Sequence, residues 1–373
     1  MDKIKVMHFL SDTNIGGAGK YLITYCKNRD KDKYDVIVAL PEGSLLIPEL
    51  ETTGVRIITL NGLKDKSFDI GAIGKLKKII KEEKPNIVHT HASLSARIAA
   101  RSLKGCKIIY TRHCDFEPSS MYNNGLVRKL NGWFNKKYAD SIIATSEHAK
   151  ENLVKQGIDE SLITTISNGF DGHMIIGAQQ RDAIRQKYGI TSDEVVIGYL
   201  ARLVELKGHK YLIDSAKILK EKYKDTKFKV LIMGSGDYEQ TLKEYAKQNG
   251  VEDIVIFTGF ITNTEEMLNI VDIQVNCSYL SETTNLALIE GLSLGIPSVA
   301  TNIGGNSQIV KDNVNGYVVP IQDPEKMAES IYLITKDPER YSQMKNEAKR
   351  IFEEEFNSKV FAKNIEKVYE RII

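Results

Sequence analysis

The sequence lacks any apolar run that approaches the roughly 20 residues needed to cross a membrane. It also lacks low-complexity tracts, and its cysteines, Cys26, Cys106, Cys114 and Cys277, do not have the paired spacing of a zinc site or a disulfide framework. The N-terminus has an acidic residue, Asp2, and only a short apolar segment, so a signal peptide is not expected. These absences favour a soluble protein of the reducing cytoplasm.

The chain has 373 residues, which is long for one hydrophobic core, and two domains are therefore expected. Its charge is nearly balanced overall but unevenly distributed. Residues 1–170 contain 26 Lys and Arg against 19 Asp and Glu, a net of +7, whereas the remainder contains 25 against 30, a net of −5. This asymmetry either marks an anionic partner for the first half or reflects solvated surface alone. Nucleic acid is not expected as that partner.

Short β-branched runs alternate with segments of helical period along the chain, a pattern that predicts an α/β fold with parallel sheets. Many runs are continuously apolar, as strands are when both faces of a sheet are covered. We expect two doubly wound sheets joined across residues 168–195, and a strand-free helical segment over 338–373. The expected strands are 4–10, 35–40, 55–60, 86–89, 107–111 and 141–144 in the first half, and 195–200, 228–233, 254–257, 272–276, 297–301 and 317–319 in the second.

A glycine-rich segment, DTNIGGAGKYL, follows the first expected strand. It is similar to the phosphate loop of an ATPase, but Asn14 stands where that loop needs glycine and Tyr21 where it needs a hydroxyl for magnesium. A glycine-rich turn between a strand and a helix can still offer backbone N–H groups to a phosphate. Gly16 and Gly17 are expected there because a Cβ would obstruct close approach or forbid the backbone angles.

Charged side chains stand in two expected loops of the second half. ARLVELKG places Arg202 and Lys207 after a strand, where two cations either clamp a diphosphate or form an exposed basic loop. In SETTNLALIEGLSLG, Glu282 precedes an apolar helix and Glu290 interrupts it, and a carboxylate in so apolar a run needs donors. Residues 283–285 can cap the helix and leave its N–H groups to an anion. The alternative is that Glu282 favours the helix dipole and Glu290 finds an internal partner.

The ordered set of motifs resembles the retaining glycosyltransferases of family four across nearly the whole chain. Glu282 and Glu290 form an E-x7-E pair, which lies between ARLVELKG and GIPSVATNIGG. The other motifs precede this pair in the expected order: GGAGKYL, IVHTH, YTRH, IATSEHAK, ISNGFD, GSGDYEQTL and FTGF. The resemblance implies the GT-B fold, in which two Rossmann-like domains face a central cleft and the C-terminal helix returns to the first domain. We expect residues 1–170 with about 356–373 to form the acceptor-side domain, and residues 171–355 to bind the nucleotide sugar.

Carried over to this sequence, the family pattern assigns Glu290 to the ribose hydroxyls of the donor and Glu282 to a sugar hydroxyl. Arg202 and Lys207 would neutralise the diphosphate leaving group. His113, in YTRHCDF, would donate to the sugar's 6-hydroxyl or to the developing negative charge, unless it is a structural histidine held by the loop backbone. The other implied donor contacts come from a glycine pair, a base pocket and the start of a helix: Gly16, Gly17, Phe260, Ile261, Thr283, Thr284, Asn285 and Leu286.

One departure from the family pattern lies beside the sugar. Many relatives have glycine directly after the first Glu and two places later, where this chain has Thr283 and Asn285. Because Asn tolerates left-handed backbone angles, we expect the loop to be retained. The added side chains should change the contacts to the donor sugar.

The resemblance implies transfer of a sugar from a nucleoside diphosphate sugar, with UDP-N-acetylglucosamine and UDP-glucose favoured, to a hydroxyl acceptor with retention. The implied mechanism is front-face attack, in which the leaving phosphate helps to deprotonate the acceptor. A glycan, glycolipid or polyisoprenoid-linked intermediate of a bacterial envelope polysaccharide is the expected acceptor, and neither a metal nor another cofactor is expected. The alternatives are a GT-B nucleotide-sugar epimerase, which would release sugar-nucleotide isomers without acceptor, and a non-catalytic sugar-nucleotide-binding protein.

The stretch GLVRKLNGWFNKKYAD combines apolar and aromatic residues at helical spacing with four cations. Through residues 126–138 such a helix can rest on an anionic membrane, which would place the protein peripherally on the inner face of the cell membrane. The alternative is that the stripe packs against its own sheet.

The histidines are not expected to bind a metal. His89 and His91 lie at the end of the same expected strand, but the sequence shows no third metal ligand near them. No role is expected for His8, His148, His173 or His209.

Overall fold

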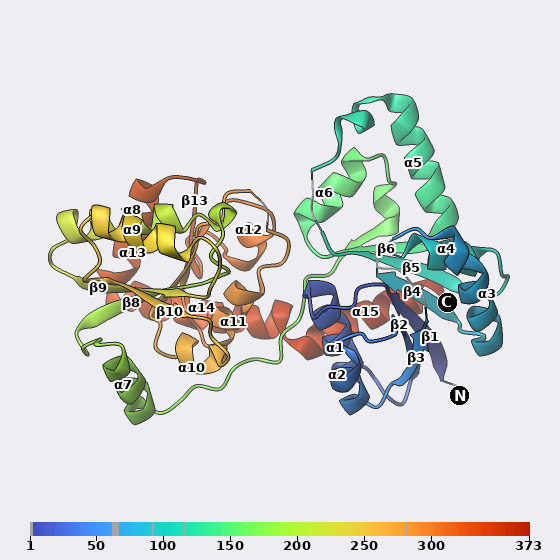
Figure 1. Cartoon of the computed structure of the whole chain (residues 1–373), viewed down its shortest axis with the longest axis horizontal. Helices are drawn as coiled ribbons and strands as arrows, with labels where there is room; N and C mark the ends of the chain where they lie inside the picture. The colour runs from blue at the N-terminus through green and yellow to red at the C-terminus, as the bar shows by residue number, and fades with distance from the viewer. Residues whose placement is uncertain (1–2, 62–66, 92, 115–116, 281) are drawn as a thin grey trace. The chain divides into compact units, whose positions relative to one another are not determined.

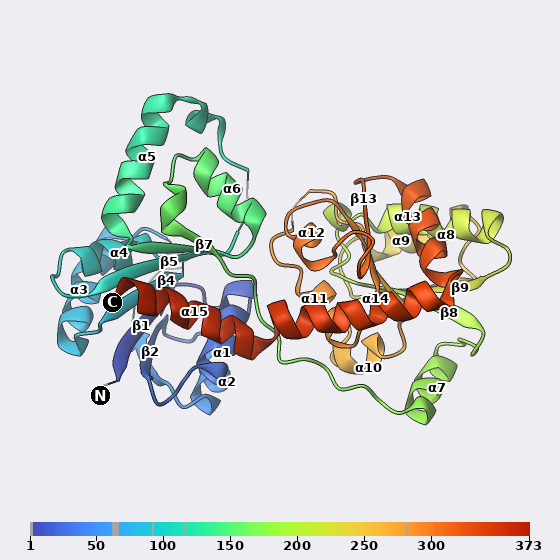
Figure 2. The ribbon, with the colours of Figure 1, turned by 180° about the vertical axis from the view of Figure 1, so that it is seen from behind.

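The computed structural model describes residues 3–61, 67–91, 93–114, 117–280 and 282–373. The chain divides into two compact units: unit 1 consists of Met1–Asp171 and Asn357–Ile373, and unit 2 of Gly172–Phe356. Each border lies one residue from the border expected from the sequence. Figures 1 and 2 show both units from opposite sides.

Unit 1 is built on a parallel sheet in the order β3-β2-β1-β4-β5-β6-β7. One face of this sheet is covered by α1 and the C-terminal helix α15, and the other by α3 and α4. The strands are β1 (Ile4–Leu10), β2 (Tyr34–Pro41), β3 (Arg56–Leu60), β4 (Ile87–His91), β5 (Lys107–Arg112), β6 (Ser141–Ala144) and β7 (Ile163–Thr165). The helices are α1 (Gly17–Asn28), α2 (Ile47–Thr52), α3 (Ile70–Glu83), α4 (Leu94–Arg101), α5 (Gly125–Tyr138), α6 (Glu147–Lys155) and α15 (Ser358–Ile372).

Unit 2 repeats the arrangement with a parallel sheet in the order β10-β9-β8-β11-β12-β13. The strands are β8 (Glu194–Leu200), β9 (Lys227–Met233), β10 (Val255–Gly259), β11 (Ile273–Asn276), β12 (Ser298–Thr301) and β13 (Gly316–Val319). The helices are α7 (Ala178–Lys187), α8 (His209–Lys222), α9 (Glu239–Gln248), α10 (Thr264–Leu268), α11 (Leu286–Ser293), α12 (Asn306–Ile309), α13 (Pro324–Thr335) and α14 (Pro338–Ile351).

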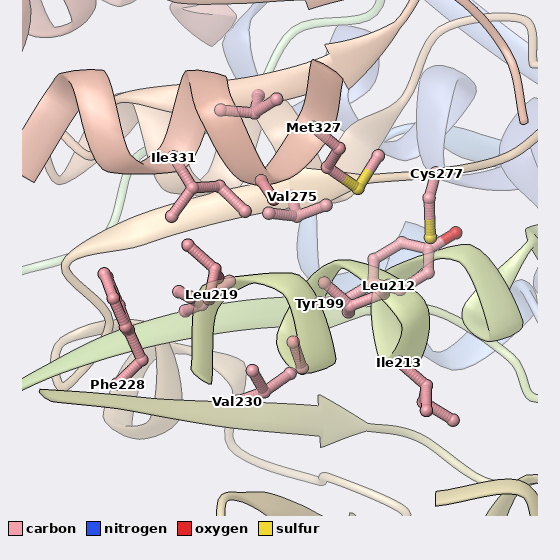
Figure 3. Packing of buried hydrophobic residues seen from close by; sticks show 14 of the residues in the cluster. Tyr199, Leu212, Ile213, Leu219, Phe228, Val230, Val275, Cys277, Met327 and Ile331 are labelled. Atoms are coloured by element: carbon pink, nitrogen blue, oxygen red, sulfur yellow. The ribbon is translucent and has the colours of Figure 1, made fainter. Parts of the chain in front are cut away.

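The core of unit 2 lies between its sheet and the helices α8 and α13. Figure 3 shows Leu212 and Leu219 of α8 together with Met327 and Ile331 of α13, and Val275 of β11 packs among them. These side chains are almost wholly buried. Such burial of branched apolar side chains stabilises the fold by about 1.5–3 kcal/mol for each of them.

The predicted fold class is confirmed, and α15 packs on unit 1 as expected. All twelve expected strands form, with ends within two residues of their expected positions. The sequence did not predict β7, a three-residue edge strand, because so short a run carries little periodicity. The join between the expected sheets contains α7.

Candidate active site

The loops that carry Arg202, Lys207 and Glu282 follow two neighbouring strands of unit 2. Lys207 ends a short 3-10 turn after β8, and Glu282 follows β11, which pairs with β8. At this pair the strand order reverses, since β9 and β10 lie on one side and β12 and β13 on the other. Doubly wound sheets bind ligands at the carboxyl ends of strands beside such a reversal. The charged residues therefore stand where the fold favours a ligand site.

Glu282 is buried, and three donors meet at one of its oxygens. Its Oε1 accepts hydrogen bonds from Lys207 Nζ and Ser278 Oγ, both at 2.5 Å, and from Asn276 Nδ2 at 3.3 Å. Among the described residues no donor reaches Oε2. The carboxylate is thus held by one oxygen, and the other remains to accept from a ligand hydroxyl.

A buried asparagine network supports this carboxylate from behind. Asn306 Nδ2 donates to Asn276 Oδ1 at 3.0 Å and to the Thr301 carbonyl at 3.1 Å, and Asn285 Nδ2 donates to Asn306 Oδ1 at 3.3 Å. Because the members satisfy one another, the network fixes the Glu282 loop at low desolvation cost. Asn276 and Asn306 were not predicted as site residues from the sequence; the position of Asn276 at the end of an expected strand was the available signal.

The two cations of ARLVELKG have different surroundings. Lys207 is tied to Glu282, and its carbonyl accepts from the Tyr199 hydroxyl at 2.7 Å. The Arg202 side chain is exposed and has no ion-pair or hydrogen-bond partner among the described residues. A guanidinium free of internal partners can bind an anion without first breaking a contact.

The helix α11 begins beside Glu282 and is capped by Asn285, whose Oδ1 accepts from the Leu288 N–H at 3.3 Å. Across the described residues, the N–H groups of Leu286 and Ala287 meet no acceptor, so they can face an anion. Asn285 has φ −78° and ψ 93°, which is extended backbone. The expectation that this loop uses left-handed tolerance is therefore wrong: the Asn is retained as a cap. Thr283 and Thr284 are partly buried before it.

Glu290 lies in α11, and its Oε2 is 3.2 Å from His173 Nε2. The other ring nitrogen of His173 is 3.5 Å from Glu265 Oε2, and the His173 N–H donates to Ser293 Oγ at 3.1 Å. The carboxylate therefore finds an internal partner, as one alternative predicted. No role was expected for His173, which lies 117 residues from Glu290 in the sequence.

The expected base-pocket residues follow β10. Phe260 is 75 % exposed, an unusual position for an aromatic ring, whereas Ile261 packs partly buried against the core that contains Met267. An exposed ring at the carboxyl end of a strand is available to stack on a planar ligand.

In unit 1, Gly16 caps α1 and Gly17 is its first residue. Gly16 has φ −100°, and Gly17 is not among the residues with positive φ. A Cβ would meet only Asp12 Oδ2 at 3.6 Å at Gly16 and nothing within 4 Å at Gly17. The expectation that the backbone angles require glycine is therefore wrong here. We therefore propose the other reason for glycine at these two positions: a ligand approaches the backbone closely there.

His113 follows β5 and lies at the end of a row of histidines. Its Nε2 is 2.8 Å from His91 Nδ1, and His91 Nε2 is 3.0 Å from His8 Nδ1. His8, His89 and His91 bring ring nitrogens within 4.8 Å of one another, an arrangement that could hold a metal ion. The expectation that no third histidine lies near the HTH pair is wrong, since β1 pairs with β4 and brings His8 beside it.

Two family models match the chain. Residues 15–172 match the model described as Glycosyltransferase Family 4, and residues 180–351 match the model described as Glycosyl transferases group 1. The chain belongs to glycosyltransferase family 4.

Curated relatives of this family 4 glycosyltransferase extend over most of its length. It is 28 % identical to the putative glycosyltransferase EpsD of Bacillus subtilis over 74 % of each chain. It is 25 % identical to an Escherichia coli UDP-Gal:alpha-D-GlcNAc-diphosphoundecaprenol alpha-1,3-galactosyltransferase over 90 % of this chain and 89 % of the relative.

Solved structures share the fold of the family 4 chain. Anabaena HepE, in complex with UDP, matches 98 % of this chain and 100 % of its own with a TM-score of 0.83 and 19 % identity. A glycosyltransferase from Rickettsia africae matches 100 % and 99 % with a TM-score of 0.82 and 20 % identity. At such identities the likeness concerns the GT-B fold.

The helix α5 of this family 4 enzyme presents an apolar face to solvent. Leu126, Leu130 and Trp133 are 66 %, 57 % and 60 % exposed, while Asn135 on the opposite side is buried. The alternative that this stripe packs on its own sheet is therefore wrong for these three side chains. Figures 1 and 2 both show α5 standing out from the sheet. No helix among the described residues is long and apolar enough to span a membrane.

Proposed function

We propose that the protein transfers a sugar from a nucleoside diphosphate sugar to a hydroxyl acceptor with retention at the anomeric carbon. The observation that carries this proposal is an arrangement of three charged groups in unit 2, where the strand order of the sheet reverses. In the part of the chain that the structure describes, they are the buried Glu282 carboxylate with one oxygen free of donors, the adjacent Lys207 ammonium and the Arg202 guanidinium without an internal partner. Glu282 binds a sugar hydroxyl, and Arg202 and Lys207 neutralise the leaving diphosphate. UDP-N-acetylglucosamine and UDP-glucose are the proposed donors, and the UDP named for HepE and the Escherichia coli relative supports the uridine nucleotide.

The other residues of the site contact the remaining parts of the donor. Glu290 accepts hydrogen bonds from the ribose hydroxyls, which then either replace His173 as the partner of this carboxylate or share the carboxylate with it. Phe260 and Ile261 form the base pocket. The backbone N–H groups at the start of α11, from Thr284 to Leu286, support the sugar and phosphate, and Thr283 adds bulk beside the sugar.

In the proposed front-face reaction the acceptor hydroxyl attacks the anomeric carbon as the bond to the diphosphate breaks, and the hydroxyl proton passes to a leaving phosphate oxygen. The fixed charges of Arg202 and Lys207 stabilise the negative charge that develops there, which is the largest contribution such a site can make. Gly16, Gly17 and His113 of unit 1 complete the set of proposed contacts to the donor and acceptor. No metal or other cofactor has a step in this scheme.

Donor binding is tested by the thermal stability of the protein with a panel of nucleotide sugars. One UDP-sugar at about a hundredfold excess over its dissociation constant should raise the unfolding free energy by roughly 2.7 kcal/mol. Glu290→Ala should abolish that gain, because the ribose hydroxyls lose their acceptor. Glu325→Ala, an exposed carboxylate elsewhere in unit 2, serves as the control and should keep it.

Two outcomes would contradict the proposal. If no nucleotide sugar stabilises the protein at millimolar concentration, the donor site is assigned wrongly. If the bound donor is converted to a free isomer without acceptor, the reaction is an epimerisation and not a transfer.

We further propose that the acceptor is lipid-linked or a glycan of a bacterial envelope polysaccharide, and that α5 rests on the anionic inner face of the cell membrane. The diphosphoundecaprenol named for the Escherichia coli relative supports a lipid-linked acceptor. The exposed Leu126, Leu130 and Trp133 supply the apolar contact. Arg128, Lys129, Lys136 and Lys137 supply positive charge, and α5 contains no acidic side chain.

Trp133 is the chain's single tryptophan and reports directly on this contact. Its fluorescence emission should shift to shorter wavelength with vesicles containing phosphatidylglycerol, because the ring leaves water, and should not shift with phosphatidylcholine alone. Leu126→Ser with Leu130→Ser should weaken vesicle binding by about tenfold, which corresponds to about 1.4 kcal/mol. Binding that is unchanged by these substitutions, or equal for both lipids, would contradict the proposal.

A further inference from the structure

A continuous hydrogen-bonded row of side chains runs through the buried polar part of unit 1. It begins at Thr111, whose hydroxyl lies 2.6 Å from His89 Nε2, and continues from His89 Nδ1 to the Tyr369 hydroxyl at 2.8 Å. From Tyr369 it passes to His8 Nε2 at 3.3 Å. From His8 it continues through His91 to His113 by the 3.0 and 2.8 Å contacts described above. The row joins the strands β1 and β4 and the end of β5 to the last turn of α15.

Every ring nitrogen in the interior of the row has a partner within the row. His8, His89 and His91 each use both nitrogens, and all three side chains are fully buried. His113 uses Nε2, and no described residue pairs with its Nδ1. The row therefore has one open end, and that end is the side chain that the proposed function assigns to the sugar.

The imidazoles in the row are neutral at physiological pH. Burial lowers the pKa of His8 and of His113 to about 3, with the Arg29 charge adding to the effect at His8. Burial also holds the pKa of His89 and of His91 well below its usual value, and the neighbouring histidines add to it. A neutral imidazole has one donor and one acceptor nitrogen, and a hydroxyl has one hydrogen to donate. If each group donates to the next one along the row, only two proton orders remain.

The hydroxyls at the buried end decide between the two orders. The Tyr21 hydroxyl is buried and makes no hydrogen bond among the described residues, and Thr111 is the side chain with which it interacts. If Tyr21 turns to donate toward Thr111 and Thr111 donates to His89, every hydrogen of the row meets an acceptor within it except the one on the open Nδ1 of His113. In the reverse order Thr111 accepts from His89, and the Tyr21 hydrogen is left buried without an acceptor, which is unfavourable.

We infer that this row fixes His113 as the Nδ1–H tautomer, so that its open nitrogen is a hydrogen-bond donor for an acceptor oxygen of the sugar or its leaving group. In this order His8, His89 and His91 also carry their protons on Nδ1. His91, His8 and Tyr369 are positioning residues, since they act only through His113. The part concerning the sugar rests on the proposed function, whereas the tautomer does not.

A metal ion at His8, His89 and His91 is the competing interpretation of the same cluster. It would take one nitrogen from each of these histidines and break the hydrogen bond that this nitrogen makes in the row, since a nitrogen can hold either a proton partner or a metal. The described residues also place no carboxylate within this group of donors. Burying a divalent charge without a counter-charge is costly, and we therefore favour the hydrogen-bonded row.

The test is nitrogen NMR of the imidazole rings in the full-length protein labelled with 15N-histidine. The expected spectrum shows His113 with a protonated, pyrrole-type Nδ1 and an unprotonated Nε2. Tyr369→Phe should remove this preference and move His113 toward Nε2–H, which free neutral histidine favours, because the row is then broken at its centre. Tyr34→Phe is the matched control: its ring also packs on Tyr369, but its hydroxyl meets only the Glu366 carbonyl, at 3.5 Å.

Three results would overturn the inference. They are an Nε2–H tautomer of His113 in the unaltered protein, an unchanged tautomer in Tyr369→Phe, and joint displacement of the His8, His89 and His91 signals by one equivalent of Zn²⁺. With a working donor and acceptor, Tyr369→Phe should lower kcat by about tenfold while Tyr34→Phe leaves it unchanged. If the tautomer responds but kcat does not, the row stands and the contact of His113 with the sugar is refuted.

Discussion

Replacing Lys207 with methionine is expected to lower kcat for sugar transfer by about 10²–10³, the usual effect of removing one preorganised charge from a developing anion. The same change leaves the buried Glu282 carboxylate without its cation. Ser278 and Asn276 still donate to it, so we expect a loss of stability of no more than about 3 kcal/mol, the lower end of the cost of an unpaired buried charge. Turnover with the donor and urea unfolding measure the two effects.

A second substitution separates these effects. Glu282→Gln in the Lys207→Met background removes the unpaired charge and should restore much of the stability, while turnover stays low because the diphosphate still lacks its cation. Arg202→Met should lower kcat similarly with no loss of stability, since Arg202 has no internal partner among the described residues. Lys224→Met, which replaces an exposed lysine elsewhere in unit 2, should change neither quantity. Full turnover in Lys207→Met would refute the role of Lys207.

Gly208→Ala is expected to destabilise the protein by about 3–4 kcal/mol and to weaken donor binding through its neighbour Lys207. Gly208 has φ +68°, and a Cβ there would lie 2.0 Å from the backbone oxygen of Cys277. Because neither backbone can yield without moving the turn, the ammonium of Lys207 should shift away from Glu282. Urea unfolding followed by circular dichroism and the nucleotide-induced stability gain measure the outcome.

Gly250→Ala is the matched control for this clash. Gly250 has nearly the same φ, +67°, but no atom lies within 4 Å of an added Cβ. It should therefore show only the strain of a left-handed residue, about 1–2 kcal/mol. Equal destabilisation by both substitutions would mean that the approach of Gly208 to Cys277 does not matter.

The twelve strands could be predicted because a strand covered on both faces is apolar along its whole length, and that signal is local. The placing of Arg202, Lys207 and Glu282 in loops after strands followed from the same pattern. The borders of the two compact units lie one residue from those that the family resemblance implies. Local strand signals indicate only the join over residues 168–195.

Two reasons given from the sequence were wrong although the residues stand where expected. Gly16 needs no special backbone angle, and Asn285 is an extended cap and not a left-handed residue. Residue type alone indicates what a backbone can adopt, whereas the packing of the loop selects the conformation that it does adopt.

The sequence by itself determined the order of elements, the fold class and the family, because these depend on local periodicity and on motifs that are contiguous in the chain. Only the tertiary structure decided the partners: His173 beside Glu290, Asn276 and Ser278 on Glu282, and His8 and Tyr369 in the row that ends at His113. Parallel strands that are neighbours in the sheet can be eighty residues apart in the chain. The order of strands in the sheet therefore decides which side chains meet at the strand ends, and no local sequence pattern predicts that order.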